Sequence, residues 1–192
     1  YLFGNIRSFK KNVYRVGFVG KYKKNNILKK RGILISTGTS NIGYENISQT
    51  LYKTILNKKF ENYKFYIDKK LLINQNLLPK NIKVADFSQN MFKKIKVALI
   101  KPGFGTIHDC LERGIPIISY LAGKNKEFTH NAKILKQNKI GDYFFEFKNA
   151  LNNTILTFND NNKINKIEKI CKNLNWNGEQ DIKKYISKIK II

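Results

Sequence analysis

The sequence is poor in the residues that bind metal ions or form disulfides. It has two cysteines, two histidines and no Asp-x-Asp motif. Cys110 and Cys171 lie far apart among apolar residues, so neither a disulfide nor a zinc-ligand spacing is present, and we expect two buried free thiols. His108 and His130 form no ligand pattern either. The sequence therefore predicts no metal site and no disulfide framework.

Long apolar runs are also missing. No run approaches the roughly 20 residues that a membrane-spanning helix needs. Hydrophobic residues nonetheless make up 42% of the 192 residues, which is enough for a sizeable core. The first residue is a tyrosine and the one methionine is Met91. We therefore expect a cytoplasmic domain that is part of a longer protein.

Acidic residues are scarce, because 13 Asp and Glu stand against 37 Lys and Arg, giving a net charge of +24. Such a charge suggests nucleic acid or an anionic membrane surface as a partner. However, the lysines are spread along the whole chain, and Lys, Asn and Ile are enriched together, as an AT-rich coding sequence would produce whatever the function. We expect no nucleic acid partner. Weak attraction to the inner face of the plasma membrane fits better, since each basic residue near anionic lipid contributes about 1 kcal/mol.

Short apolar runs alternate with amphipathic segments along most of the chain. Strands are expected at residues 14–19, 33–37, 63–67, 82–85, 97–100, 116–120 and 143–145. Helices are expected around residues 47–55, 91–94, 107–111, 128–135, 164–174 and 182–189. Strands that alternate with helices predict an α/β fold, a Rossmann-like doubly wound parallel sheet with C-terminal helices.

A glycine-rich turn, residues 101–109, leads from one expected strand into the next helix, and residues 38–43 and 123–127 follow two other strands. In a parallel sheet all three turns open on the same edge, where ligands bind. Gly103 and Gly105 let a ligand approach the backbone closely, and Thr106 is expected at the helix N-cap, where free N–H groups favour an anion. Because the pattern matches neither a Walker motif nor the dinucleotide fingerprint, it indicates phosphate without naming the nucleotide.

Several side chains near these turns have two interpretations. Asp109 could accept hydrogen bonds from a ribose diol, or it could form a capping box with Thr106. Glu127 could bind sugar hydroxyls or merely favour the start of its helix. His108 could contact phosphate or lie at the surface, and Lys101 is expected to be a solvated charge at the strand end.

Five motifs in this order resemble the C-terminal, nucleotide-sugar-binding half of the two-domain (GT-B) glycosyltransferases, in particular the peptidoglycan N-acetylglucosaminyltransferases that make lipid II. The motifs are residues 33–39, 81–91, 101–109, 114–118 and 127–135, and the resemblance covers residues 14–145. It implies that residues 1–31 are a linker and first strand from a missing N-terminal half. Residues 32–150 would then form the nucleotide-sugar-binding domain, and residues 151–192 a helical extension.

The resemblance also implies a set of residues that bind a UDP-sugar donor. They are Gly38, Thr39 and Ser40 facing the diphosphate, Phe87 and Ser88 at the uracil edge, Gly103, Phe104, Gly105 and Thr106 around the phosphates, Asp109 on the ribose hydroxyls, and Glu127 and Asn131 in the segment that holds the donor sugar. Two positions depart from the family pattern. Asp109 is shorter than the usual glutamate, and Phe128 replaces an amide, which leaves the identity of the sugar open.

The activity implied is that of a hexosyltransferase, which transfers a hexosamine or hexose from a UDP-sugar to a lipid-linked or cell-envelope glycan without a metal ion. No cofactor is expected besides the UDP-sugar substrate. The catalytic base of such enzymes often lies in the N-terminal half, so no catalytic residue is assigned. Two alternatives remain: a nucleotide-sugar hydrolase on the same fold, or a non-catalytic or split subunit that binds a membrane partner or RNA.

Overall fold

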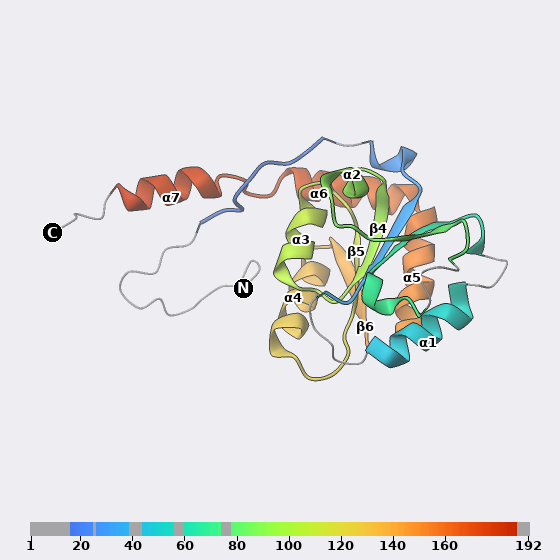
Figure 1. Cartoon of the computed structure of the whole chain (residues 1–192). Helices are drawn as coiled ribbons and strands as arrows, with labels where there is room; N and C mark the ends of the chain where they lie inside the picture. The colour runs from blue at the N-terminus through green and yellow to red at the C-terminus, as the bar shows by residue number, and fades with distance from the viewer. Residues whose placement is uncertain (1–15, 25, 39–43, 56–59, 74–77, 188–192) are drawn as a thin grey trace.

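The computed structural model describes residues 16–24, 26–38, 44–55, 60–73 and 78–187 (Figure 1). Its strands form one six-stranded sheet in the order β3-β2-β1-β4-β5-β6, and every neighbouring pair is parallel. The strands are β1 (Gly32–Ser36), β2 (Lys64–Ile67), β3 (Ile82–Val84), β4 (Ile95–Ile100), β5 (Ile117–Tyr120) and β6 (Gly141–Phe144). The predicted Rossmann-like parallel sheet is thus confirmed.

Helices cover both faces of the sheet. Figure 1 shows α1 and α5 on one side, and α3 and α4 on the other. The helices are α1 (Tyr44–Ile55), α2 (Gln89–Phe92), α3 (Phe104–Leu111), α4 (Lys126–Gln137), α5 (Phe147–Asn159), α6 (Asn161–Lys172) and α7 (Gly178–Ile186), with single 3-10 turns η1 (Ile27–Lys29) and η3 (Lys69–Leu71). No helix among the described residues is long and apolar enough to cross a membrane.

The core follows directly from the apolar runs. Every residue of β1 and β4 is buried, because helices cover these central strands on both faces, and such strands are apolar throughout. The predicted face of α1 is buried at Ile47, Leu51 and Ile55. Both cysteines are buried and free, as expected, and burial raises the pKa of the Cys171 thiol to about 12.

Three expectations about elements need correction. Residues 16–19, the described part of the strand expected at 14–19, belong to no strand; instead the backbone of Phe18 hydrogen-bonds Asn175 and Gly178 near the C-terminus. Helix α5 was not predicted; it extends across residue 150 and packs against β4 and β5. In α7, Ile182 and Ile186 of the expected apolar face are exposed.

Helix α4 ends at an unusual residue. The N–H of Lys139 donates to Lys136 and the N–H of Ile140 to Leu135, the pattern that closes a helix through a left-handed residue. Lys139 takes that left-handed conformation, with φ +57°. Glycine is usual there because a Cβ atom strains it, by about 1 kcal/mol or more.

Candidate functional site

The order of the sheet reverses between β1 and β4. From β1 the chain moves outward to β2 and β3, then returns to place β4 beside β1 and continues the other way. Ligands of open α/β sheets bind in the crevice outside the carboxyl ends of the strands at such a reversal. The turns after β1 and β4 lie at that point, and the N–H of Lys101 donates to the carbonyl of Ser36 to join the two strand ends. The topology therefore brings together the turns that begin at Gly38 and Gly103.

The turn after β4 presents backbone donors to open space. Gly103 is the N-cap of α3 in an extended conformation and has no side chain to accept from the helix. The N–H groups of Phe104, Gly105 and Thr106 begin α3, so no carbonyl of the helix accepts their hydrogen bonds. The positive end of the helix dipole also lies here. Among the described residues, a Cβ atom at Gly105 would meet nothing within 4 Å, and one at Gly103 would meet only the ring of Phe128, at 4.0 Å. An anion can therefore reach these amides.

This geometry corrects two expectations. Since α3 begins at Phe104, Thr106 lies inside the first turn and is not the N-cap. A capping box between Thr106 and Asp109 is therefore excluded, which removes one of the two interpretations of Asp109. Lys101, expected to be solvated, is buried with 3% of its surface exposed, and this burial lowers its pKa.

Helix α4 supports the same turn. The buried side-chain amide of Asn131 donates to the carbonyl of Pro102 at 3.0 Å. Asn131 thus holds the backbone that leads into Gly103. Glu127 is exposed in the first turn of α4, whose N-cap is Asn125, so both interpretations of Glu127 stay open.

A buried hydrogen-bond chain fixes the turn after β1. The N–H of Gly38, a residue with φ +64°, donates to Ser36 Oγ at 3.0 Å, and that hydroxyl donates to Asp68 Oδ2 at 3.0 Å. Asp68 also accepts from the N–H of Lys70. The neighbouring Thr37 hydroxyl is buried and has no hydrogen-bond partner among the described residues. Thr39 and Ser40, both predicted to face the diphosphate, lie outside the described residues.

The Ser36–Asp68 link is expected to stabilise both the domain and this turn. Ser36→Ala deprives a buried carboxylate of one donor, so the free energy of unfolding should fall by about 1–3 kcal/mol in urea denaturation. Ser119→Ala is the matched control, because Ser119 is buried on β5 and its hydroxyl has no partner among the described residues. That control should be neutral or stabilising. Equal losses from both substitutions would contradict a specific role for the link.

Asp109 lies on α3 with 37% of its side chain exposed. Its Oδ1 is 3.9 Å from Nη1 of Arg113, one helical turn later. Burial raises the pKa of the Asp109 carboxyl, and the charges of Arg113 and His108 oppose the shift. The carboxylate is accessible enough to accept hydrogen bonds from a ligand.

His108 joins α3 to segments before β1 and after α6. Its Nε2 lies 2.8 Å from the carbonyl of Val19, and its ring contacts Phe18 and Trp176. His108, Asp109 and Glu112 offer ligand atoms within 4.8 Å of one another, a grouping that the sequence pattern did not predict. The Glu112 carboxylate already pairs with Lys23 at 2.6 Å and with Arg113 at 3.2 Å, which disfavours binding of a further cation.

The predicted uracil segment, Phe87 and Ser88, lies between β3 and α2. Phe87 is 40% exposed with a left-handed backbone, φ +53°, and such strain often marks a functional residue. The backbone of Ser88 is used internally, since its N–H donates to Asp86 and its carbonyl accepts from Phe92. The structure also places α2 beside Arg113, at the far end of α3 from the Gly103 turn. The contribution of Phe87 and Ser88 to a uracil site stays a prediction.

Comparison with known proteins shows what this fold is. No protein-family model matches the chain, and no curated protein matches its sequence. Among solved structures, the spinosyn forosaminyltransferase SpnP superposes with a TM-score of 0.61 at 12% identity over 90% of this chain and 49% of that one.

Two further structures give the same result. SnogD from Streptomyces nogalater has a TM-score of 0.55 at 15% identity, over 83% of this chain and 42% of that one. SsfS6 from Streptomyces sp. SF2575, solved with thymidine diphosphate, has a TM-score of 0.53 at 17% identity, over 84% and 42%. The chain spans less than half the length of these glycosyltransferases. It has the fold of the C-terminal half of a GT-B glycosyltransferase.

Proposed function

We propose that this chain is the donor-binding half of a nucleotide-sugar glycosyltransferase. One observation carries the proposal: the glycine turns after β1 and β4 meet where the strand order reverses, and the amides that begin α3 open there. Such a place binds phosphate groups. The likeness to glycosyltransferases, one of them solved with thymidine diphosphate, supports a nucleoside diphosphate as the bound group.

In this proposal the turn acts on the departing diphosphate. Negative charge grows on that group as the bond to the sugar breaks, and preorganised backbone N–H groups stabilise developing charge of this kind. The amides of Phe104, Gly105 and Thr106 have that role, with the α3 dipole behind them. Because these donors already stand where the charge develops, we propose transfer without a metal ion.

The motifs favour a UDP-sugar, with Asp109 on the ribose hydroxyls and Glu127 near a hexosamine or hexose. The ring of Phe128 borders Gly103, so an apolar surface lies beside the phosphate turn where related enzymes have an amide. The acceptor, a lipid-linked or cell-envelope glycan, and the catalytic base would belong to the other half of the enzyme. The net charge of +24 suits work at an anionic membrane surface.

Calorimetry with UDP, UDP-N-acetylglucosamine and thymidine diphosphate tests the proposal. Micromolar UDP binding is expected, and only millimolar or absent binding of all three ligands by folded protein would refute it. Gly105→Val serves as a matched variant, because the new side chain enters open space beside the amides. Its stability should change by no more than about 0.5 kcal/mol. Its affinity for UDP should fall by about tenfold or more, the effect of losing one hydrogen bond to a charged group.

A further inference from the structure

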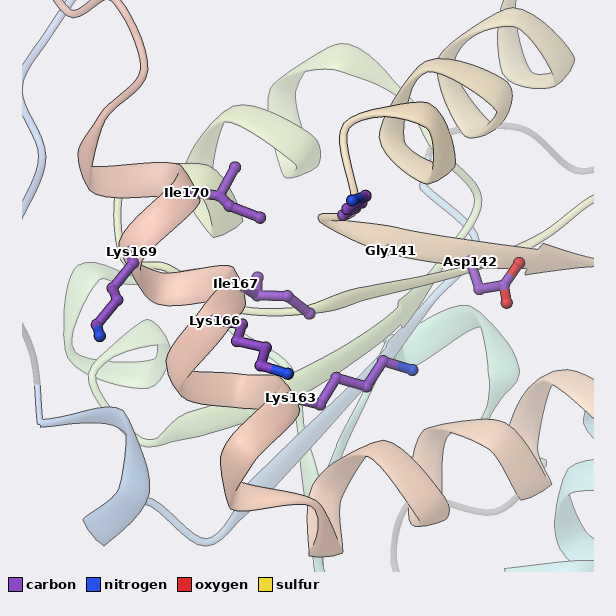
Figure 2. Close-up of a pocket in the computed structure, with 8 residues that line it drawn as sticks. Gly141, Asp142, Lys163, Lys166, Ile167, Lys169 and Ile170 are labelled. Carbon is purple, nitrogen blue, oxygen red and sulfur yellow. The ribbon is translucent and has the colours of Figure 1, made fainter.

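A pocket lies at the opposite end of the sheet from the donor turns. It has a volume of about 500 Å³ and lies between α6 and the start of β6 (Figure 2). Gly141, the first residue of β6, is part of its lining, which places it at the amino ends of the strands. Its volume is in the range of small-molecule sites. The proposed donor site does not account for this pocket.

The lining of this pocket is strongly basic. Lys163, Lys166 and Lys169, called the basic strip below, follow one another at every third position of α6, and all three line the pocket. Figure 2 shows Lys163 and Lys166 side by side on the β6 side of α6 and Lys169 pointing to the other side of the helix. The carboxylate of Asp142 in the same lining already pairs with Lys136, at 2.9 Å. Three lysines along one wall of the pocket make the local potential positive, which favours binding of an anion.

A fourth lysine reaches the pocket from a strained position. Lys139 is the left-handed residue at the end of α4, where glycine would be favoured. The chain therefore keeps a basic side chain in the pocket despite the backbone strain.

The pocket also has an apolar part. Ile167 is buried and Ile170 is half-buried on α6, and both lie among the lysines in Figure 2. An ammonium group is a compact charge that binds phosphate without the planar geometry that arginine prefers. The combination suits a phosphate group attached to an apolar or sugar moiety.

We propose that this pocket binds the phosphate group of a ligand distinct from the nucleotide donor. The same chemistry occurs in the headgroup of an anionic lipid and in a free phosphate compound. Both place a doubly or singly charged phosphate between Lys139 and the α6 lysines, with the attached group against the two isoleucines.

The test compares two triple variants with equal loss of charge. Lys163→Gln, Lys166→Gln and Lys169→Gln remove the basic strip. Lys64→Gln, Lys80→Gln and Lys83→Gln remove three exposed lysines at the β2–β3 edge, far across the sheet. Binding of inorganic pyrophosphate is measured by calorimetry with UDP present in excess, and binding of lipid by flotation with phosphatidylcholine vesicles with and without phosphatidylglycerol.

The basic-strip variant should lose roughly fivefold in affinity per lysine, on the order of 100-fold in all, for at least one probe. The control should lose much less, because charges beyond about 10 Å are screened at 0.1 M salt. If the basic-strip variant loses affinity for the vesicles alone, the ligand is a lipid headgroup. If it loses affinity for pyrophosphate alone, the ligand is a free phosphate compound. Equal losses in the two variants, or binding of neither probe by the wild type, would overturn the proposal.

Lys139→Gly separates binding from stability. It should raise the melting temperature by relieving the backbone strain, while weakening the affinity for the same probe severalfold. A higher melting temperature with unchanged affinity would overturn the role of Lys139. Titration of all variants with UDP keeps the two proposals apart, since loss of UDP binding bears on the donor site alone.

Discussion

Replacing Arg113 by methionine is expected to lower the free energy of unfolding by about 3 kcal/mol. Arg113 follows α3 with 2% of its surface exposed. Its guanidinium donates to the carbonyl of Asp109 at 2.7 Å, to Glu112 at 3.2 Å and to Gln89, and it lies over the ring of Phe92. Methionine fills much of the volume but removes the donor to the Asp109 carbonyl and leaves the buried Glu112 carboxylate with Lys23 alone. The loss should appear as a lower midpoint in urea denaturation.

Lys23→Met is the matched control, because it removes the other cation bound to the same carboxylate. Lys23 Nζ lies 2.6 Å from Glu112 Oε2, but 41% of the lysine side chain is exposed. Such a pair contributes no more than about 1 kcal/mol. Equal losses of stability from the two substitutions would show that the buried bonds of Arg113 contribute no more than the exposed Lys23–Glu112 pair. That pair would then be the contact that anchors the segment before β1.

Much of the fold could be predicted because the central strands are covered on both faces. β1 and β4 therefore appear in the sequence as continuous apolar runs, which local reading detects. The segment at residues 16–19 has a similar apolar content, but Phe18 packs against Trp176 instead of entering the sheet. The local sequence pattern does not distinguish a strand of the sheet from an apolar segment that packs outside it. Helix α5 carried a detectable signal, since Phe147, Leu151 and Phe158 share one buried face.

The candidate site also has a part that the sequence could predict and a part that it could not. The glycine turns after β1 and β4 are local, and their place at the reversal follows from the order of strands. The bonds that hold them are not local: Ser36 meets Asp68 across 32 residues, and Asn131 meets the Pro102 carbonyl across 29. These contacts form only after β2 pairs with β1 and α4 packs beside the turn. No spacing rule predicts them, whereas the error at Thr106 came from starting α3 three residues late.

Asp109→Asn is expected to weaken UDP binding by about 10- to 100-fold, the equivalent of one hydrogen bond to a charged acceptor. The comparison ligand is 2′-deoxy-UDP, which lacks one of the two ribose hydroxyls. Wild-type protein should prefer UDP over the deoxy compound, and the variant should lose most of that preference. Glu146→Gln removes an exposed carboxylate after β6, and as a control for net charge it should leave both affinities unchanged.

Stability measurements then separate binding from structure. Because burial raises the folded-state pKa of Asp109, its carboxyl favours folding below its ordinary pKa, and that contribution disappears as the pH rises through the raised value. Removing the charge should therefore leave stability at neutral pH equal or higher. A capping role would give the opposite result, a loss of about 1 kcal/mol, but α3 starts five residues earlier. Unchanged discrimination between UDP and 2′-deoxy-UDP would show that Asp109 does not contact the ribose, and the donor site would then rest on the two glycine turns alone.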